Sequence, residues 1–329
     1  MKIYRNVNEI PHNTNRAITV GSFDGIHLGH LQILKNLKSN AQKNNLTSMV
    51  ITFEPHPQIY FSAKTNTLFP LLTTVKEKIY FLELLGIDEL FIINFDEEIA
   101  NIEPVEFVNY LKNIGFSLFV IGYNHSFGKN RKGNWILLEK INEISKSKNE
   151  EPFKIVQVPR FTITNSKVSS NAKISSTEIR RILRDCNVEN ANELLGHYYF
   201  VSGNVEKGSG VGKTIGFPTA NIYKTNNKLL PRNGVYACKI ELLGKNYFGV
   251  ANIGYRPTVA NTSISKNSSP VLEVHIFDFA GDIYDITVLV SFVRFLREEK
   301  KFNNKSELIQ QISDDVAFCR RIFGLKNSN

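Results

Sequence analysis

The stretch RAITVGSFDGIHLGHLQILKNLKSNA (residues 16–41) decides the fold of the first half of the chain. Its first five residues, RAITV, are largely apolar and β-branched, as in a buried strand. Leu31, Leu34 and Leu37 then recur at helical spacing, so a helix follows almost directly. The segment between them, GSFDGIHLGH (21–30), is therefore predicted to be a strand-to-helix turn.

The composition of this turn suits the binding of an anion. Backbone amides at the start of a helix point toward an incoming ligand, and the helix dipole adds to the attraction for negative charge. Gly21, Gly25 and Gly29 let the backbone bend and approach a phosphate closely. His27 and His30 lie three residues apart, on one helical face, where both can donate to phosphoryl oxygens. The spacing does not match G-x-G-x-x-G, which disfavours a Rossmann dinucleotide site.

Other uses of the turn stay open at this point. A histidine at a helix start is usually a capping or solvated residue, and glycine-rich turns are common. Two histidines could also bind zinc, but a third ligand is missing nearby, and Asp24 is only a possible one. Phosphate binding, a plain loop and, behind both, a zinc site remain the three hypotheses.

Length and composition favour two globular domains. The chain has 329 residues, 42% hydrophobic and 22% charged, which exceeds the usual domain size of roughly 100 to 200 residues and argues against global disorder. Its net charge of +9 is scattered, so it suits nucleotides as well as nucleic acid. Cys186, Cys238 and Cys319 form no disulfide framework or CxxC metal knuckle, and no apolar run suggests a signal or a membrane span. We therefore expect a cytoplasmic protein.

Strand-like runs alternate with helical patterns in the first half. The runs are short and rich in β-branched or aromatic residues, at 16–23, 46–53, 89–95, 117–122 and 154–158. Such alternation predicts a Rossmann-like α/β domain with a doubly wound parallel sheet, whose active loops lie at the carboxyl ends of the strands. The last helix of this half is expected within ISSTEIRRILRDC (174–186).

The pattern changes in the second half. From Tyr198 onward, alternating or aromatic-rich runs separated by Gly, Asn and Pro turns predict an antiparallel β-barrel. An amphipathic helix over 306–324 closes the chain, with Ser306 as its expected N-cap. The predicted domains are residues 1–186 and 187–329.

Two motifs in the first half resemble a known superfamily. The order Gly-x-Phe-Asp-Gly-x-His-x-Gly-His is similar to the His-x-Gly-His signature of nucleotidylyltransferases, and ISSTEIR (174–180) matches the second motif of that superfamily. Ser176 and Thr177 are expected to cap a helix and donate hydroxyls, and Arg180 to reach a triphosphate. With TFEPHP (52–57), IGYNHSFG (121–128) and RKG (131–133), the first half resembles the adenylyltransferase module of bacterial bifunctional riboflavin kinase/FAD synthetases.

The resemblance implies a reaction and roles for these residues. FMN phosphate would attack the α-phosphorus of ATP, giving FAD and pyrophosphate without a covalent enzyme intermediate. His27 and His30 would stabilise the α-phosphate, and Asn124 would lie near the reacting groups on the flavin side. His125 stands where an aromatic residue is usual. The residues assigned to ATP and its phosphates in this domain are Gly21, Phe23, Asp24, Gly25, Gly29, Ser176, Thr177 and Arg180.

The second half carries a misleading motif and an informative one. GSGVGKT (208–214) is similar to a Walker A loop, but Lys207 stands where that pattern needs glycine, and IGFPTAN follows instead of a helix.

GKTIGFPTAN (212–221) resembles the phosphate-binding stretch of riboflavin kinases. Thr219 offers a hydroxyl and Asn221 a carbonyl, both suited to Mg²⁺ and its phosphates. Lys213 replaces the more usual Arg at a phosphate-binding position.

Further matches follow in family order at 234–237, 249–259, 272–284 and 295–302. Glu273 fits the general base that takes the proton from the ribityl 5′-hydroxyl as that oxygen attacks the γ-phosphate of ATP. Arg297 falls at a flavin-binding position, and His275 is expected to be structural. Asp285 stands where the family usually has glycine.

We therefore expect a bifunctional transferase that phosphorylates riboflavin to FMN in the barrel and adenylylates FMN to FAD in the first domain. ATP, riboflavin and FMN would be its substrates, FAD its product and Mg²⁺ its cofactor, with no nucleic-acid or membrane partner. One alternative is a riboflavin kinase whose adenylyltransferase half is weakened at His125. Another is a flavin- or RNA-binding regulator on the same fold. The chain lacks the aromatic and basic signature of an RNA surface, and its chemical residues are intact.

Overall fold

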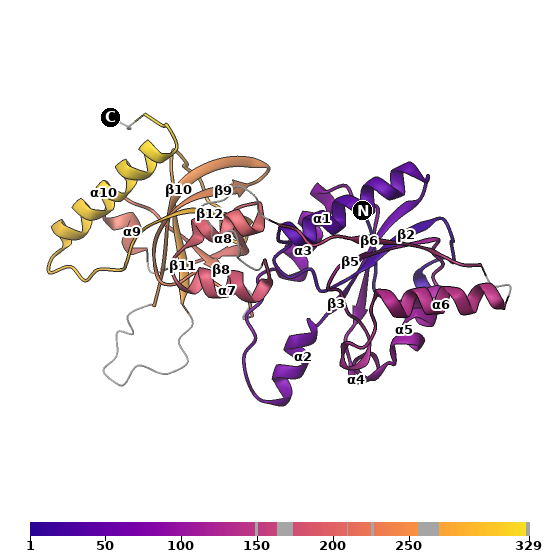
Figure 1. Cartoon of the computed structure of the whole chain (residues 1–329). Coiled ribbons are helices and arrows are strands. Elements are labelled where there is room, and N and C mark those ends of the chain that lie inside the picture. Colours follow the sequence, from indigo (N-terminus) through magenta and orange to yellow (C-terminus); the bar gives the residue numbers. More distant parts are fainter. Residues whose placement is uncertain (149–150, 163–173, 209, 225–226, 256–269, 327–329) are drawn as a thin grey trace. The chain divides into compact units, whose positions relative to one another are not determined.

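The computed structural model describes residues 1–148, 151–162, 174–208, 210–224, 227–255 and 270–326. The chain forms two compact units, Met1–Ile174 and Ser175–Asn329, each with its own sheet (Figure 1). Among the described residues, no helix is both long enough and apolar enough to span a membrane.

The first unit is built on a six-stranded parallel sheet in the order β1-β4-β3-β2-β5-β6. Its strands are β1 (Lys2–Tyr4), β2 (Arg16–Val20), β3 (Thr47–Glu54), β4 (Glu89–Asn94), β5 (Leu118–Gly122) and β6 (Lys154–Val158). The five expected strands are confirmed, and the short β1 was not expected. The parallel pairing confirms the predicted α/β architecture.

Helices cover both faces of this sheet, as Figure 1 shows. On one face, α1 (Leu28–Lys43) and α3 (Val75–Leu84) pack against alternate residues of the strands, such as Val50 and Leu90. On the other face, α5 (Pro104–Lys112) and α6 (Trp135–Ser147) pack against residues such as Ile51 and Phe91. The remaining segments of this unit are α2 (Pro57–Lys64), α4 (Glu97–Asn101), and the 3₁₀ turns Val7–Glu9 and Lys129–Arg131.

The strand order creates a switch point between β2 and β5. From β2 the chain runs outward through β3 to β4, and then returns to place β5 on the other side of β2. The connections that follow β2 and β5 therefore leave in opposite directions, and open α/β sheets generally bind ligands outside the carboxyl ends of the strands at such a point. Gly21 follows β2 and Tyr123 follows β5, so the turn at 21–30 and the segment around Asn124 both begin at this edge.

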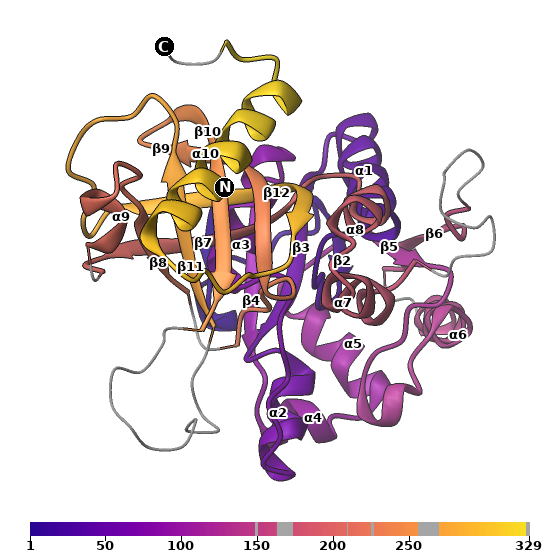
Figure 2. The same cartoon turned by 90° about the vertical axis from the view of Figure 1, so that its left-hand side faces the viewer.

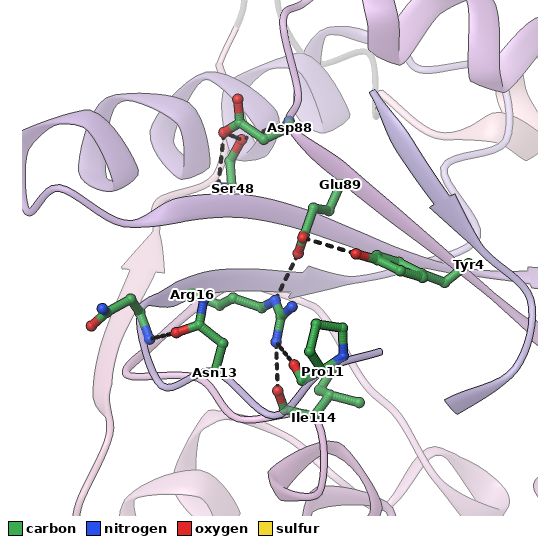
Figure 3. Close-up of polar contacts among 9 residues, drawn as sticks. Tyr4, Pro11, Asn13, Arg16, Ser48, Asp88, Glu89 and Ile114 are labelled. Atoms are coloured by element: carbon green, nitrogen blue, oxygen red, sulfur yellow. Dashed lines mark hydrogen bonds and ion pairs between the residues drawn. The ribbon is translucent and has the colours of Figure 1, made fainter. Parts of the chain in front are cut away.

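A buried ion pair joins two strands at the other end of the sheet, where the strands begin (Figure 3). Arg16 opens β2, is 1% exposed, and its Nε lies 2.6 Å from Glu89 Oε2 at the start of β4. The same guanidinium donates to the carbonyls of Pro11 and Ile114 at 2.8 and 2.6 Å, and the Tyr4 hydroxyl donates to Glu89 at 3.2 Å. Because every charge has hydrogen-bonded partners, this cluster can be buried without a large penalty.

The second unit is a closed antiparallel barrel in the order β10-β11-β8-β7-β12-β9. Its strands are β7 (Tyr199–Glu206), β8 (Ala220–Tyr223), β9 (Gly234–Leu242), β10 (Lys245–Gly254), β11 (Val271–Ile276) and β12 (Thr287–Arg297). Helix α10 (Lys305–Ile322) lies on the outside of the barrel, with Cys319 against Ala237 (Figure 2). Its N-cap is Asn304, whose side chain accepts from the Glu307 amide, so the prediction of Ser306 is wrong by two residues.

Three further helices belong to this unit: α7 (Ser176–Arg184), α8 (Val188–Leu195) and the one-turn α9 (Val211–Thr214). Helix α7 is tied to the barrel segments, because the Leu183 carbonyl accepts from the Arg232 amide at 3.0 Å. The compact units therefore divide before α7, at 174/175. The functional boundary at 186/187 stays a prediction.

Candidate active sites

The turn after β2 has an unusual backbone that neighbouring residues hold in place. Phe23, Gly25 and Ile26 all have positive φ, at 45°, 87° and 43°. This region is unfavourable for Phe and for β-branched Ile. Their buried side chains anchor the turn in the core below α1. Asp24 Oδ1 accepts from the Thr73 amide at 2.9 Å, and the Gly25 amide donates to Thr73 Oγ1 at 2.8 Å. The turn is thus rigid before any ligand arrives.

The two histidines of the turn form a stacked pair. His27 is the N-cap of α1, and its Nδ1 accepts from the His30 amide at 3.3 Å. The ring centroids lie 3.7 Å apart at an interplanar angle of 16°. Because an accepting nitrogen carries no proton, the proton of neutral His27 lies on Nε2, where it can be donated. The spacing of three residues therefore brings the rings together as predicted.

His30 is partly exposed as a whole, but one nitrogen of its ring is enclosed. Its Nδ1 is buried and has no hydrogen-bond partner among the described residues. Burial, together with the neighbouring His27, Lys78 and His125, lowers the pKa of His30 well below its ordinary value. The ring is therefore neutral at neutral pH, and an anion bound beside it would favour its protonation.

The two flanking glycines make room for these rings. A Cβ at Gly29 would lie 3.3 Å from the imidazole of His27, and one at Gly21 would lie 3.0 Å from the ring of Phe23. Their φ values are not positive, so space for the side chains, rather than backbone freedom, accounts for glycine at these two positions.

The segment after β5 brings a third histidine to the same edge. Asn124 lies exposed in the turn that follows the strand. The His125 amide donates to the Gly122 carbonyl at 3.1 Å, and its ring meets Phe127 edge-on at 6.3 Å. Burial and the charge of Arg131 lower the pKa of His125 to about 4. At neutral pH, His125 is therefore an uncharged ring, as the usual aromatic residue would be.

The ISSTEIR stretch forms the start of α7, but its cap differs from the prediction. Ser175 Oγ accepts from the Glu178 amide at 3.3 Å, so Ser175 is the N-cap and the assignment of Ser176 and Thr177 as caps is wrong. Ser176 and Thr177 are instead the first two residues of the helix. Arg180 is buried, whereas the exposed Arg181 pairs with Glu178 on its own helix.

In the barrel unit, four polar residues lie in one row across neighbouring strands. Asn221 in β8 stands opposite Glu206 in β7 and opposite Glu273 in β11, and Glu273 stands opposite Asn252 in β10. Directly opposed side chains project on the same face of a sheet, with their Cβ atoms about 5 Å apart. Register therefore places the predicted metal ligand Asn221 beside the predicted base Glu273.

Two glycines of the GSGVGKT stretch, Gly208 and Gly212, lie close to Asn221 and Thr219. A Cβ at Gly208 would overlap the Asn221 amide nitrogen and lie 2.7 Å from its Cγ. A Cβ at Gly212 would overlap the Phe217 carbonyl and lie 3.1 Å from Thr219 Oγ1. The Phe217 amide in turn donates to the Gly212 carbonyl at 2.9 Å. These glycines thus allow the segment to fold over the Pro-Thr-Ala-Asn residues, with Lys213 exposed on α9.

Two other predicted residues have defined contacts. The contacts of His275 agree with the structural role expected for it: its Nδ1 donates to the Pro218 carbonyl at 2.8 Å and its ring meets Phe217 edge-on. Arg297 forms a two-pronged ion pair with Asp315 of α10, at 3.0 Å from Nε and 2.7 Å from the terminal nitrogen. Its flavin-binding role stays a prediction.

The donor atoms in the barrel suit a magnesium–phosphate complex. Thr219, an exposed residue, supplies a hydroxyl, and the buried Asn221 supplies a carbonyl, so both offer oxygen donors. Mg²⁺ typically takes one or two protein oxygens and fills its remaining positions with water and phosphate. In the part of the chain that is described, no group of three or more His, Cys, Asp or Glu side chains could hold a metal ion. The described residues therefore offer no set of ligands for the zinc site considered as a hypothesis.

Sequence reasoning missed two residues that hold the turn after β2. Thr73 contacts Asp24 and Gly25, and Lys78 donates to the Ser22 carbonyl. The signal available was the capping box of Thr74 and Glu77, which marks the start of α3. The capping box shows where the helix begins, but it does not show which residues of other elements the helix contacts.

Comparisons with known proteins agree with both halves of this description. Residues 9–172 match the FAD synthetase family, and residues 195–323 match the riboflavin kinase family. A bifunctional riboflavin kinase/FMN adenylyltransferase from Escherichia coli K12 is 35% identical over 99% of both chains. One from Bacillus subtilis 168 is 34% identical over 93% of this chain and 92% of its own.

A solved structure also matches along nearly the whole length. A crystal structure described as a macrolide-efflux protein from Streptococcus pneumoniae has a TM-score of 0.78 and 30% identity, covering 95% of this chain and 96% of its own. The fold and the two family segments occur in the order expected from the motifs. The chain belongs to the family of bifunctional riboflavin kinases/FMN adenylyltransferases.

Proposed function

We propose that this chain makes FAD from riboflavin in two ATP-dependent steps, phosphorylation in the barrel and adenylylation in the parallel-sheet unit. The presence of both family segments in one chain carries this proposal, with a rigid histidine turn in one and a paired Asn221 and Glu273 in the other. The neutral ring of His125 supports a retained adenylyltransferase over a weakened one.

In the adenylylation step, an FMN phosphate oxygen attacks the α-phosphorus of ATP, and the bond to the β-phosphate breaks with release of pyrophosphate. The protein's task is to orient two anions and to stabilise the additional charge on the α-phosphate. His27 donates from Nε2, and His30 gains a proton more readily once phosphate is bound, for the electrostatic reason given above. The role expected for Ser176, Thr177 and Arg180 with the β- and γ-phosphates stays a prediction, because α7 belongs to the second compact unit. Asn124 is a proposed ligand of the flavin substrate.

In the kinase step, Glu273 takes the proton of the ribityl 5′-hydroxyl while that oxygen attacks the γ-phosphorus of ATP. Asn221 and Thr219 are proposed to hold Mg²⁺ with its phosphates, which the place of Asn221 beside Glu273 in the register supports. When bound, the ion neutralises phosphate charge. Lys213 adds a positive charge from α9, and Arg297 is proposed to contact the flavin. Both steps use small molecules of the cytoplasm, where we place the protein.

Two variants test whether each unit catalyses one of the two reactions. His30→Ala should abolish FAD formation from FMN but leave FMN formation from riboflavin intact, whereas Asn221→Ala should do the reverse. Each reaction is followed separately by chromatography of the flavins at saturating ATP and Mg²⁺. His12→Ala and Asn246→Ala, exposed residues of the same types in the same units, serve as controls. Equal loss of both activities in either variant would refute the assignment of one reaction to each unit.

A further inference from the structure

Lys78 is a buried lysine that reaches the adenylyltransferase turn from a different helix. It lies in the first half of α3, and 3% of it is exposed. Its Nζ donates to the Ser22 carbonyl at 2.6 Å and to Thr52 Oγ1 at 2.8 Å. The Thr52 hydroxyl itself donates to the Ser22 carbonyl at 3.4 Å. The ammonium thus joins Thr52, near the end of β3, to Ser22, which directly precedes the first residue of the turn with positive φ, Phe23.

The two hydrogen bonds described for the Lys78 ammonium both go to neutral oxygens. Asp24 of the turn and Glu54 of β3 are near enough to favour its charged form, but burial outweighs them and lowers the pKa of Lys78 to about 8. On the side of α1, Lys78 lies close enough to His30 to lower the pKa of that histidine. Because a buried cation is costly and the nearby carboxylates do not offset its burial, its position beside a phosphate-binding turn suggests that a bound anion completes its environment.

We propose that Lys78 is a positioning residue of the adenylyltransferase site: it holds the Ser22 carbonyl, and through it the turn that carries His27, and keeps a positive charge beside His30. The inference rests on the proposed function, because the anion concerned is the phosphate of ATP or FMN. It adds a residue from α3 to a site otherwise made by the turn after β2.

The test compares three variants of the full-length protein in FAD formation. Lys78→Met keeps most of the side-chain volume but removes the charge and both hydrogen bonds, so kcat should fall on the order of 100-fold. Thr52→Val removes one acceptor and keeps the charge, so the loss should stay below about 10-fold. Lys76→Met, an exposed lysine of the same helix, is the control and should not change the rate. FMN formation by the same preparations shows that the protein is intact.

The pH profile separates this role from simple packing. In the wild type, kcat/KM for ATP in FAD formation should fall above about pH 8 as Lys78 loses its proton. This limb should disappear in Lys78→Met, and in Thr52→Val it should move to lower pH, because a lost acceptor disfavours the charged form. The Thr52→Val profile decides the matter even if Lys78→Met fails to fold.

A wild-type rate in Lys78→Met would overturn the proposal, as would an alkaline limb that is unchanged in Thr52→Val. If the wild-type protein itself formed no FAD, the proposed function would fail instead, and the two failures are thereby distinguished.

Discussion

Gly208→Ala should damage the kinase site while leaving the barrel nearly as stable as before. The added Cβ would lie 2.7 Å from Asn221 Cγ, whereas ordinary contact begins near 3.4 Å. The carboxamide must therefore retreat by about 0.7 Å at Cγ and by more at its nitrogen. A side-chain amide can move more easily than backbone, so the loss of stability should be small. Misplacement on the order of 1 Å can lower a rate about 100-fold, which is the expected loss of kcat/KM in FMN formation.

The assay follows ATP-dependent conversion of riboflavin to FMN, together with thermal unfolding of the same preparation. FAD formation from added FMN is the internal control and should be unaffected. Gly244→Ala is a matched variant with the opposite expectation. Its Cβ would meet no atom within 4 Å, but its φ of +72° is unfavourable for alanine. It should lose about 1 kcal/mol of stability and keep full kinase activity.

The reasoning about Asn221 would be refuted by either of two results. One is a Gly208→Ala protein whose FMN formation equals that of the wild type. The other is a loss of FMN formation in Gly244→Ala as large as that in Gly208→Ala, because general destabilisation would then explain both.

Three further changes test other parts of the account. Glu273→Gln should lower kcat of FMN formation by on the order of 100- to 10,000-fold with little change in substrate binding; a raised KM at unchanged kcat would make Glu273 a binding group. Glu89→Gln should cost about 3 kcal/mol or more in thermal unfolding because it leaves Arg16 charged and buried, whereas Lys38→Met, which breaks an exposed pair at 3.2 Å, should cost less than about 1 kcal/mol. A fragment beginning near residue 187 should fold and phosphorylate riboflavin; if only a longer fragment that includes α7 is active, the proposed boundary is wrong.

Local sequence signals found the elements that carry strong patterns. The apolar runs of β2 to β5 identified these residues as strands, because a parallel sheet is buried on both faces and leaves few polar positions. The leucine spacing identified α1 as a helix. The barrel strand β8 was missed, since its four residues overlap the end of the Pro-Thr-Ala-Asn motif and are too few to show a period. The caps at Ser175 and Asn304 were misplaced by one or two residues, because several neighbouring polar residues could serve equally.

The site residues likewise differ in how far the sequence alone could identify them. His27 and His30 could be identified from residue type and spacing, because both partners lie in one turn. Glu273 was assigned only by resemblance, since a strand carboxylate has no local mark of catalysis and its neighbour Asn221 is fifty-two positions away. Lys78 could not be recognised at all, because its significance depends on the fold bringing Ser22 and Thr52 to its ammonium.

The most direct test is a time course of the purified wild-type protein with riboflavin, ATP and Mg²⁺, with all flavins and nucleotides separated by chromatography. The account predicts that FMN appears first together with ADP, and that FAD follows after a lag with an equal amount of pyrophosphate. Riboflavin that is bound but never converted would contradict the account and favour a binding protein. Accumulation of FMN without any FAD would mean that the protein has only riboflavin kinase activity, and would contradict the claim of two activities.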